Sequence, residues 1–303
     1  MRILVVGAGA IGGYFGGRLA EKGEDVTFLV REKRKEYLYQ HGLSIESVNG
    51  SMQLAPKMIL SGEKADPFDI ILLSVKSYHL DQAVVSMRPY VGEHTYILPL
   101  LNGIAHLDLL QDAFGKEKVL GGLCFIESTI GESGNIVQMS PLHELVFGPL
   151  PSTELAHLPQ LKEVLSGTKA EIRYSDSIEQ EMWHKYVFIS ALSGVTSLFR
   201  SPIGPIRDDQ NGQSVIQSVV GEVTEIAKAI NAPVADNLQE IVLTKLQILG
   251  FQMKSSLQRD MEKNLPTEAD HFFGYLLQQK NSYTSSPVLS AIYSNITIYE
   301  KSL

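Results

Sequence analysis

The stretch MRILVVGAGAIGGYFGGRLAEKGEDVTFLVR, residues 1–31, decides the predicted fold. It opens with an apolar run at Ile3–Val6, continues through a glycine-rich turn and a helical pattern, and ends in a second apolar run at Val26–Val30. A strand, a glycine turn, a helix and a strand in this order hold the pyrophosphate of a dinucleotide at the helix N-terminus. We predict that the residues of the G-x-G-x-x-G turn bind such a cofactor: Gly7, Ala8, Gly9, Ala10, Ile11 and Gly12. A glycine turn that only packs the helix on the strands is the alternative.

The residue after the second apolar run discriminates between the two nicotinamide cofactors. An acidic side chain there accepts hydrogen bonds from the ribose 2′-hydroxyl of NAD(H), whereas a cation meets the 2′-phosphate of NADP(H). Arg31 occupies this position, and charged residues follow it. We therefore predict NADP(H) as the cofactor and expect Arg31 to bind its 2′-phosphate. The charges after Arg31 are interpreted as the solvated start of a helix over residues 32–41, which Gly42 ends.

Composition and charge narrow the class of protein. With 303 residues, 44% hydrophobic and 20% charged, the chain has enough material for about two soluble domains. A net charge of -8 argues against nucleic acid or an anionic membrane as partner and favours a small-molecule substrate. The single cysteine, Cys124, excludes an intrachain disulfide and a cysteine-based metal site and suits a reducing compartment. The longest nearly apolar stretch, residues 186–199, is too short to span a bilayer, so we expect a cytoplasmic protein without a membrane partner.

Further strands of the first half place polar residues at one edge of the predicted sheet. The expected elements are a hairpin of strands 43–47 and 51–60 joined at Asn49-Gly50, a strand over 69–74 buried on both faces, a helix over 79–87 and a strand over 96–101. Ligands of open α/β sheets bind outside the C-terminal ends of the strands. The glycine turn, Arg31, Lys76 and Asn102 all follow such ends. We expect Lys76 and Asn102 to share the cofactor site, with a solvated lysine and an ordinary turn as the alternatives.

The character of the sequence changes near residue 172. Before it, the pattern predicts antiparallel strands 119–130 and 135–147 around residues 131–134, a helix over 154–165 and a strand over 170–174. From Ser177 onward the periodicity is helical and predicts five or six helices. The predicted fold is an α/β Rossmann-type N-terminal domain over 1–172, followed by an all-α C-terminal domain over 173–303 that carries the substrate chemistry.

Lys185 is the charged residue of an otherwise apolar or small-residue helical stretch. Burial lowers the pKa of a lysine side chain and makes it a better proton donor near neutral pH. Ile189 and Ser193 lie four and eight residues further on, hence on the same helix face. A lysine that extends from a core helix to water is the alternative.

Glu268 lies in the second polar cluster of the helical half. Pro266 suits the first turn of a helix, which would place Glu268 in that turn, where the helix dipole favours a carboxylate. The position fits a helix cap as well as a functional carboxylate. Ser255 and Ser256 precede it in the same polar cluster.

Together these residues carry a resemblance that runs across essentially the whole chain. The set consists of residues 7–12, Arg31, Val75-Lys76, Asn102-Gly103, Trp183-x-Lys185, Ser255-Ser256 and Thr267-Glu268-x-Asp270, in that order. In this combination the chain resembles the ketopantoate reductase (2-dehydropantoate 2-reductase) family. The resemblance implies NADPH-dependent reduction of 2-dehydropantoate to (R)-pantoate, a step of pantothenate and coenzyme A biosynthesis. By the family pattern Lys185 matches the proton-donating lysine, Glu268 the glutamate near nicotinamide and substrate, Ser256 and Asn102 substrate contacts, and Lys76 and Arg31 positions near the NADP phosphates.

The chain departs from the family pattern on the helix of Lys185. The family sequence W-x-K-x-x-x-N-x-x-x-N lines the substrate pocket with two asparagines, where this chain has Ile189 and Ser193. We count Ser193 among the substrate-binding residues. The family's arginine before Thr-Glu is also absent, since Asn264-Leu265-Pro266 stands there. Because losing a polar partner changes discrimination between substrates, a reductase of another 2-oxo acid is an alternative, and a non-catalytic NADP(H) sensor is a second. The sequence is compatible with a homodimer but does not specify the oligomeric state.

Overall fold

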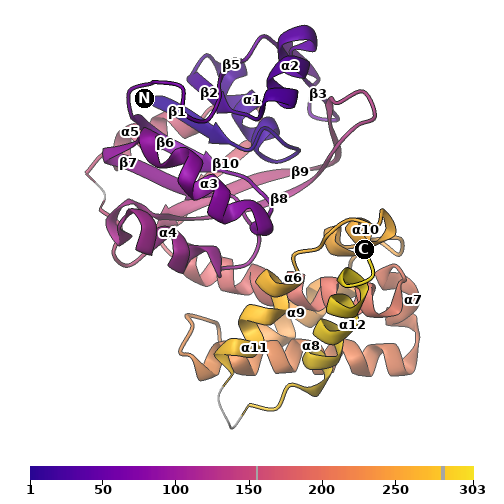
Figure 1. Ribbon diagram of the computed structural model, residues 1–303. Helices are drawn as coiled ribbons and strands as arrows, with labels where there is room; N and C mark the ends of the chain where they lie inside the picture. Colours follow the sequence, from indigo (N-terminus) through magenta and orange to yellow (C-terminus); the bar gives the residue numbers. More distant parts are fainter. Residues whose placement is uncertain (155, 281–283) are drawn as a thin grey trace. The chain divides into compact units, whose positions relative to one another are not determined.

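The computed structural model describes residues 1–154, 156–280 and 284–303, which form two compact units (Figure 1). The first unit comprises Met1–Asn102 and His106–Ile178, and the second comprises Gly103–Ala105 and Glu179–Leu303. The division near Ile178 falls later than residue 172, because strand β10 (Glu171–Tyr174) pairs with a strand of the first unit. Three residues of the first half, Gly103–Ala105, belong to the second unit.

A five-stranded parallel sheet forms the centre of the first unit. Its order is β5-β2-β1-β6-β7, with β1 (Arg2–Val6), β2 (Asp25–Leu29), β5 (Lys57–Ile59), β6 (Phe68–Leu73) and β7 (Val91–Pro99). Residues Ile70–Leu73 of β6 are fully buried, as expected for an apolar strand covered on both faces. The sheet confirms the predicted Rossmann-type core.

Helix α1 (Gly12–Lys22) connects β1 to β2 and packs closely on the sheet. A Cβ atom at Gly16 would lie 2.7 Å from Val5 Cγ2, so the helix approaches the strand to a distance that a side chain would prevent. Gly23, with φ +107°, ends the helix in a left-handed cap, and its N–H bonds to the carbonyl of Ala20. The remaining α-helices of this unit are α2 (Glu32–His41), α3 (Leu80–Met87), α4 (His106–Phe114) and α5 (Leu158–Leu165), joined by the short 3₁₀ turns η1 (Ser77–His79), η2 (Arg88–Tyr90) and η3 (Lys116–Lys118).

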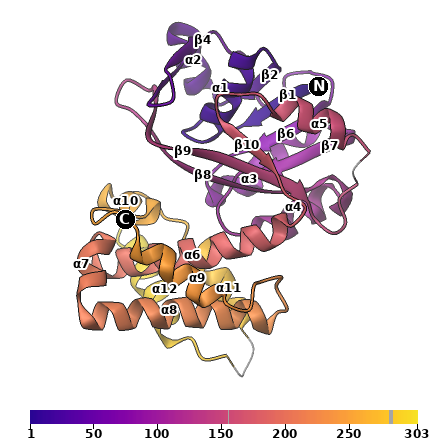
Figure 2. The ribbon, with the colours of Figure 1, turned by 180° about the vertical axis from the view of Figure 1, so that it is seen from behind.

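A second sheet lies in the same unit and contains both predicted hairpins (Figure 2). Its order is β10-β9-β3-β4, with β3 (Leu43–Ser47), β4 (Met52–Leu54) and β9 (Ile136–Pro149), and β8 (Leu120–Ile130) pairs with β9. The β3–β4 and β8–β9 pairs are antiparallel, as predicted. The predicted strand over 51–60 is wrong in its second half. The chain breaks at Pro56, which has no N–H to donate, and β5 joins the other sheet beside β2.

Two further elements differ from the prediction by several residues at their start. The predicted helix over 154–165 begins only at Leu158, and Leu155 lies outside the described residues. The predicted strand over 96–101 begins earlier, at Val91, because β7 includes the exposed polar residues Glu93 and His94, which the apolar pattern did not mark as strand.

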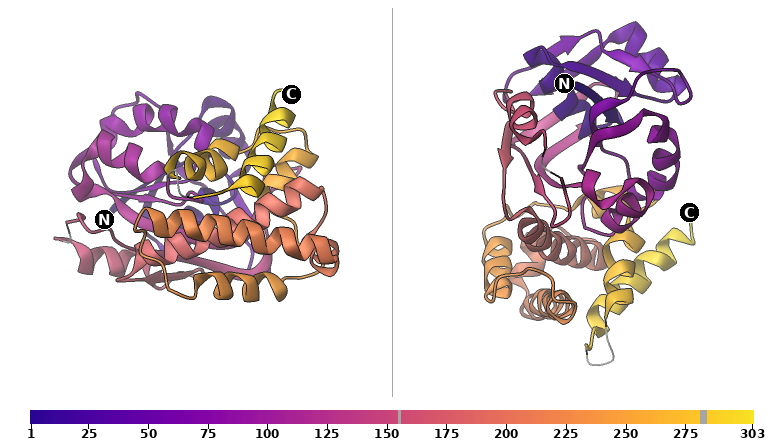
Figure 3. Two further views of the ribbon diagram at one scale, coloured as in Figure 1. Left: turned by 90° about the horizontal axis from the view of Figure 1, so that it is seen from below. Right: turned by 90° about the vertical axis from the view of Figure 1, so that its left-hand side faces the viewer.

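The second unit is helical throughout its described part (Figure 3). It contains α6 (Ile178–Phe199), α7 (Ile203–Asp208), α8 (Gln210–Ala229), α9 (Leu238–Gln247), α10 (Ser256–Glu262), α11 (Tyr275–Gln279) and α12 (Pro287–Glu300), with the π-helical turn η4 (Asp270–Gly274). Five or six predicted helices were too few, because α7, α10 and α11 are short and carry little periodicity. Long helix α8 packs against α9 and α12. Among the residues described, none of the helices combines the length and apolar character that crossing a bilayer requires.

Candidate functional site

Two of the three glycines in the turn between β1 and α1 occupy positions that leave no room for a side chain. Gly7 has φ +97°, and a Cβ atom there would lie 2.1 Å from the carbonyl oxygen of Ser74. A Cβ atom at Gly12 would lie 2.3 Å from the carbonyl oxygen of Gly7. At Gly9, by contrast, a Cβ atom would meet no described atom within 4 Å. The backbone at Gly9 therefore faces open space, which fits a position where a pyrophosphate approaches the chain.

The other residues of the turn present backbone rather than functional side chains. Ala8 is buried, while Ala10 and Ile11 are half-buried. The carbonyl of Ala10 accepts a hydrogen bond from Ser128 Oγ of β8 at 3.1 Å, which ties the turn to the second sheet. Ile11 is the N-cap of α1, and its aliphatic side chain cannot accept a bond from the first-turn N–H groups. The positive end of the helix is thus available to an anion.

The register of the parallel sheet aligns four strand ends. Val6 lies opposite both Leu29 and Leu73, and Leu73 lies opposite Pro99. Hydrogen bonds continue past the ends, from the N–H of Ser74 to the Val6 carbonyl and from the N–H of Leu100 to the Leu73 carbonyl. The segments that carry the glycine turn, Arg31, Lys76 and Asn102 therefore leave the sheet at one edge, as the strand order requires.

Arg31 is exposed at the start of α2. Its Nη2 donates to Oε1 of Gln82 on α3 at 3.1 Å. Because β2 and β6 flank β1, this bond joins the segments on either side of the glycine turn. The pKa of the nearby His79 is lowered, first by burial and then by the positive charge of Arg31. Arg31 is thus the cation of the charged run that reaches this edge.

The neighbouring cations Arg34 and Lys35 are half-buried and bonded to other segments, and are not the freely solvated helix start that the sequence interpretation expected. Arg34 Nη1 donates to the carbonyl of Gly134 at 2.9 Å, and Lys35 forms an ion pair with Glu63 at 2.8 Å. Arg34 also lies over the ring of Tyr37, at 4.9 Å from its centroid. Both side chains therefore attach α2 to neighbouring loops.

Lys76 and Asn102 occupy the ends of β6 and β7. Both are half-buried, and Lys76 is the N-cap residue of η1. Asn102 directly precedes Gly103, whose φ is +75°. A Cβ atom at Gly103 would lie 3.2 Å from Nε2 of His271 and 3.4 Å from Cε2 of Tyr186, so a side chain there would crowd these rings in addition to straining the left-handed backbone.

Helix α6 carries Lys185 in a buried position. The lysine is 8% exposed and Ser193 is 3% exposed, while Ile189 between them is half-buried. The small residues of this helix do allow close packing, since a Cβ atom at Gly194 would lie 3.0 Å from Cδ1 of Ile292 on α12. Lys185 is therefore a buried lysine on a closely packed helix, and the predicted burial is confirmed.

The two residues beside Lys185 fix α6 in the unit. Nε2 of His184 accepts a hydrogen bond from the N–H of Ala235 at 3.0 Å, so this histidine is structural. The hydroxyl of the fully buried Tyr186 donates to the carbonyl of Phe272 at 2.6 Å. Sequence reasoning missed Tyr186, whose polar tip in an apolar helix was the available signal. Its bond ties the turn of Lys185 to η4, the turn that follows Glu268.

Glu268 lies just before η4 rather than within a helix turn. The helical residues begin at Ala269, and Pro266 is in extended chain, so the prediction of Pro266 in a first turn is wrong. The carbonyl of Glu268 accepts from the N–H of Phe272 at 3.0 Å, which begins the helical ladder. Glu268 is half-buried. A π-helical turn directly after it is a feature that is frequent at functional sites.

Ser255 and Ser256 have different surroundings. Ser255 is buried and caps α10 by accepting from the N–H of Gln258 at 3.1 Å. Its hydroxyl also shares a hydrogen bond of 2.8 Å with Thr196 of α6. Ser256, the first residue of α10, is exposed. The Thr196–Ser255 bond therefore fixes the start of α10, where Ser256 lies, on the helix that carries Lys185.

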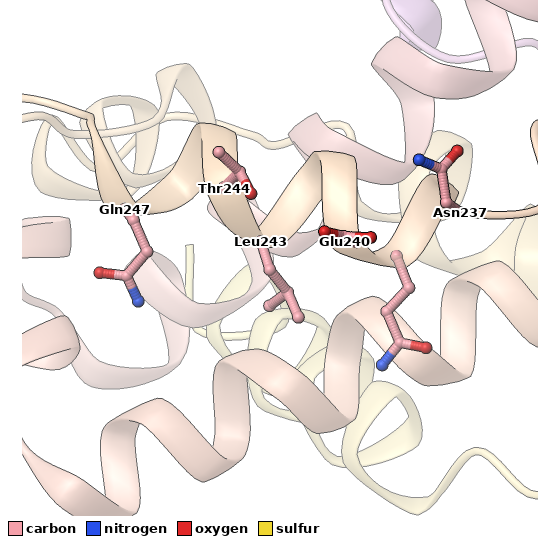
Figure 4. Close-up of a pocket in the computed structure, with 6 residues that line it drawn as sticks. Asn237, Glu240, Leu243, Thr244 and Gln247 are labelled. Atoms are coloured by element: carbon pink, nitrogen blue, oxygen red, sulfur yellow. The ribbon is translucent and has the colours of Figure 1, made fainter.

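A surface hollow in the second unit contains none of these residues. It is formed along α9 and is lined by Asn237, Gln239, Glu240, Leu243, Thr244 and Gln247 (Figure 4). It offers one carboxylate, no cation and no buried polar partner for a cofactor in its described lining. In the described part of the chain, His, Cys, Asp and Glu do not gather in threes that could hold a metal ion.

Comparisons with known proteins identify the family. A model described as ketopantoate reductase PanE/ApbA matches residues 3–152, and one described as the C-terminal part of ketopantoate reductase PanE/ApbA matches residues 177–300. The chain belongs to the ketopantoate reductase family. The α/β and helical units are those of the family fold, and the chain is an oxidoreductase that uses a nicotinamide dinucleotide.

Individual relatives of this ketopantoate reductase family member match over its whole length. An uncharacterized oxidoreductase YkpB of Bacillus subtilis (strain 168) is 42% identical over 301 residues, covering 99% of each chain. The crystal structure of 2-dehydropantoate 2-reductase from Geobacter metallireducens GS-15 has a TM-score of 0.89 at 26% identity, covering 100% of both chains. D-mandelate dehydrogenase with NADH and anilino(oxo)acetate shares the fold with a TM-score of 0.89 at 19% identity, covering 100% of this chain and 99% of that one.

Proposed function

We propose that the chain reduces a 2-oxo acid with NADPH, and that the substrate is 2-dehydropantoate, which becomes (R)-pantoate in pantothenate biosynthesis. The observation that carries the proposal is a buried lysine, Lys185, whose helix turn is hydrogen-bonded through Tyr186 to the turn after Glu268. A desolvated cation and a carboxylate on adjoining elements are what carbonyl reduction requires of a protein. Family membership supports the reaction class, and a 2-dehydropantoate 2-reductase is among the matching structures.

The first unit fits the cofactor. The open space at Gly9 and the N-terminus of α1 would hold the pyrophosphate, with Ala8, Ala10 and Ile11 completing the turn. Arg31 would pair with the 2′-phosphate, and Lys76 and Asn102 would lie beside the cofactor from the neighbouring strand ends. When bound, the reduced nicotinamide supplies a hydride to the carbonyl carbon of the substrate.

The second unit supplies the proton and the substrate contacts. We propose that the ammonium of Lys185 polarises the carbonyl oxygen and donates the proton that converts the developing alkoxide to the hydroxyl group. The Glu268 carboxylate orients the substrate or the lysine, while Ser256, Ser193 and Asn102 bind the substrate. These roles balance the reaction, because one hydride and one proton convert the 2-oxo group to a 2-hydroxyl group.

A second candidate is a reductase of a different 2-oxo acid. Ile189 replaces an amide by an aliphatic side chain on the face of Lys185, and it is half-buried. A site that loses a hydrogen-bonding partner loses discrimination for the substrate that used it. The chain shares its fold with a D-mandelate dehydrogenase whose structure contains NADH and anilino(oxo)acetate. The test therefore includes aryl 2-oxo acids as substrates and NADH as a cofactor.

The deciding experiment is NADPH oxidation over a panel of 2-oxo acids, with NADH as comparator. The proposal expects ketopantoate to give the highest kcat/KM and NADPH to be preferred. Ile189→Asn is the matched variant, since it restores the family residue. Turnover of another 2-oxo acid without detectable ketopantoate turnover would establish the second candidate. Cytoplasmic localisation, which the single Cys124 favours, remains a prediction that cell fractionation tests.

A further inference from the structure

The segment that carries Glu268 is held by the last helix of the chain, α12. Oε1 of Glu300 accepts two hydrogen bonds from Thr267, one from its N–H at 2.9 Å and one from its hydroxyl at 2.5 Å. The same hydroxyl accepts from the N–H of Ala269 at 3.2 Å. Thr267 is 5% exposed and Glu300 is half-buried, so these bonds are partly shielded from water. One carboxylate oxygen thus holds Thr267 directly, and the hydroxyl of Thr267 in turn holds the N–H of Ala269 on the other side of Glu268.

Two tyrosines of α12 hold the same segment on either side of Thr267. The hydroxyl of Tyr293 donates to Oδ1 of Asp270 at 2.5 Å, and that of Tyr299 donates to the carbonyl of Leu265 at 2.9 Å. The hydrogen bond to Asp270 raises the pKa of Tyr293 to about 12, so the phenol remains a donor through the neutral range. Together with Glu300 these side chains contact the chain on both sides of Glu268.

Helix α12 is itself anchored within the second unit. Glu222 of α8 accepts from the N–H groups of Val288 and Leu289, at 3.1 and 2.7 Å, and so satisfies the first turn of α12. Ile292 of α12 packs against Gly194 of α6 at the close approach described above. The helix is therefore a fixed support and not a loosely attached terminal segment.

The opposite end of the segment is bonded to α6. The hydroxyl of Tyr186 donates to carbonyls of η4, to Phe272 at 2.6 Å and to His271 at 3.2 Å. The backbone around Glu268 is therefore fixed from two elements of the same unit, the helix of Lys185 and α12. A carboxylate that must meet one reacting group gains rate from such fixing, because a misplacement of about 1 Å can cost about 100-fold.

We propose that Glu300 is a positioning residue for Glu268. Its carboxylate sets the backbone on which Glu268 stands, and it acts on the reaction only through Glu268. This inference rests on the proposed function of Glu268. It gives the C-terminal helix a role in the reaction that does not require any of its side chains to contact the substrate.

The test compares Glu300→Ala with Glu300→Gln, which keeps an acceptor oxygen, and with Ile298→Ala, a control at a position of the same helix that is 67% exposed. Glu300→Ala should lower kcat/KM for the 2-oxo acid about 10- to 100-fold and leave the Kd of NADPH unchanged. Glu300→Gln should recover most of the loss, and Ile298→Ala should cost less than about twofold. If Glu300→Ala folds poorly, Thr267→Val removes the same hydroxyl contact and should act in the same direction.

A double-mutant cycle separates positioning from general stability. In a Glu268→Gln background, Glu300→Ala should cost less than about twofold, because residues that act as a unit are non-additive. Equal losses in both backgrounds would overturn the proposal. Hydrogen exchange supplies a readout without turnover, since Glu300→Ala should raise exchange at the amides of Thr267 and Ala269. Unchanged exchange there would also overturn it.

The same variants distinguish this inference from the proposed function. If Glu268→Gln strongly lowers kcat/KM while Glu300→Ala leaves kcat/KM intact, the positioning role is wrong and the function of Glu268 stands. If Glu268→Gln leaves turnover intact, the function proposed for Glu268 fails, and the positioning role fails with it.

Discussion

The two units hold their proposed site residues by different physical means. In the first unit six consecutive residues form the glycine turn, and steric contacts of backbone with backbone shape it at Gly7 and Gly12. In the second unit Lys185 and Glu268 are far apart in sequence, and their segments are held by a hydrogen bond that Tyr186 donates and by one that Glu300 accepts. A phosphate needs amide groups and space, which a local turn supplies. Proton transfer needs side chains from separate segments, which only tertiary contacts supply.

The largest effect should come from the second unit and should leave cofactor binding intact. Lys185→Ala removes the proposed proton donor and should lower kcat about 100- to 10,000-fold, the range of general acid catalysis. The Kd of NADPH, measured by fluorescence titration, should change little. Lys228→Ala, an exposed lysine on α8, is the control. Weakened NADPH binding with normal turnover of bound substrate would contradict the assignment of cofactor binding to the first unit and of proton donation to Lys185.

The glycine turn offers a matched pair of substitutions. Gly9→Ala adds a Cβ where the chain leaves open space, so the protein should fold normally but bind NADPH about 10- to 100-fold more weakly, or about 1.4 to 2.8 kcal/mol. Gly12→Ala adds a Cβ 2.3 Å from a carbonyl oxygen, so it should lower Tm as well. Calorimetry of NADPH binding measures the affinity of both variants, and thermal unfolding measures their Tm. Normal NADPH affinity in a folded Gly9→Ala variant would show that the turn only packs the fold.

Replacing Arg31 tests whether a side chain adds to the NADPH binding that the backbone of the glycine turn provides. Arg31→Ala should raise the KM for NADPH about tenfold and leave the KM for NADH nearly unchanged, because a charge-assisted bond to the 2′-phosphate is lost. Lys33→Ala, an exposed neighbour on α2, serves as the control. Steady-state kinetics with both cofactors provide the measurement. An equal loss for NADPH and NADH would remove Arg31 from phosphate recognition.

The smallest effect concerns the pH dependence of stability in the helical unit. The pKa of His184 is lowered below 6.5 by burial first and then by the positive charge of Lys245, so the folded state favours the neutral ring that accepts from Ala235. The unfolded chain then binds the proton more readily, and the contribution of His184 is present above about pH 6.5 and lost as the pH falls through the lowered value. We expect a loss of about 1 kcal/mol or less.

His184→Gln checks this, because its amide can accept the same bond without titrating. Thermal unfolding between pH 7.5 and 5.5 should show a smaller decrease of Tm in the variant than in the wild type. A residual slope should belong to His79 and His143 of the first unit, whose pKa values burial also lowers. Identical slopes in both proteins would mean that His184 does not titrate differently on folding.

The sequence by itself determined the longer elements, their order and the cofactor class. Helix α2 over residues 32–41 and strand β3 over residues 43–47 match their predicted bounds, because glycine and the periodicity of apolar residues act locally. The split of residues 51–60 between two sheets was not predictable from alternation, since partner choice depends on strands distant in sequence. Short helices α7, α10 and α11 were missed because packing, and not periodicity, stabilises them.

The candidate site was likewise predictable in part from local sequence, and the rest of it depends on the tertiary structure. Local spacing singled out Gly7, Gly9 and Gly12, because the turn requires glycine at Gly7 and Gly12 and leaves open space at Gly9, all within a few residues of chain. The sheet register then decided that the strand ends share one edge. Only the tertiary structure decided how Glu268 is held, since Glu300 and Tyr186 reach its segment across more than thirty and eighty residues of chain. No local pattern encodes such bonds, because each partner's sequence neighbourhood is that of an ordinary amphipathic or apolar helix.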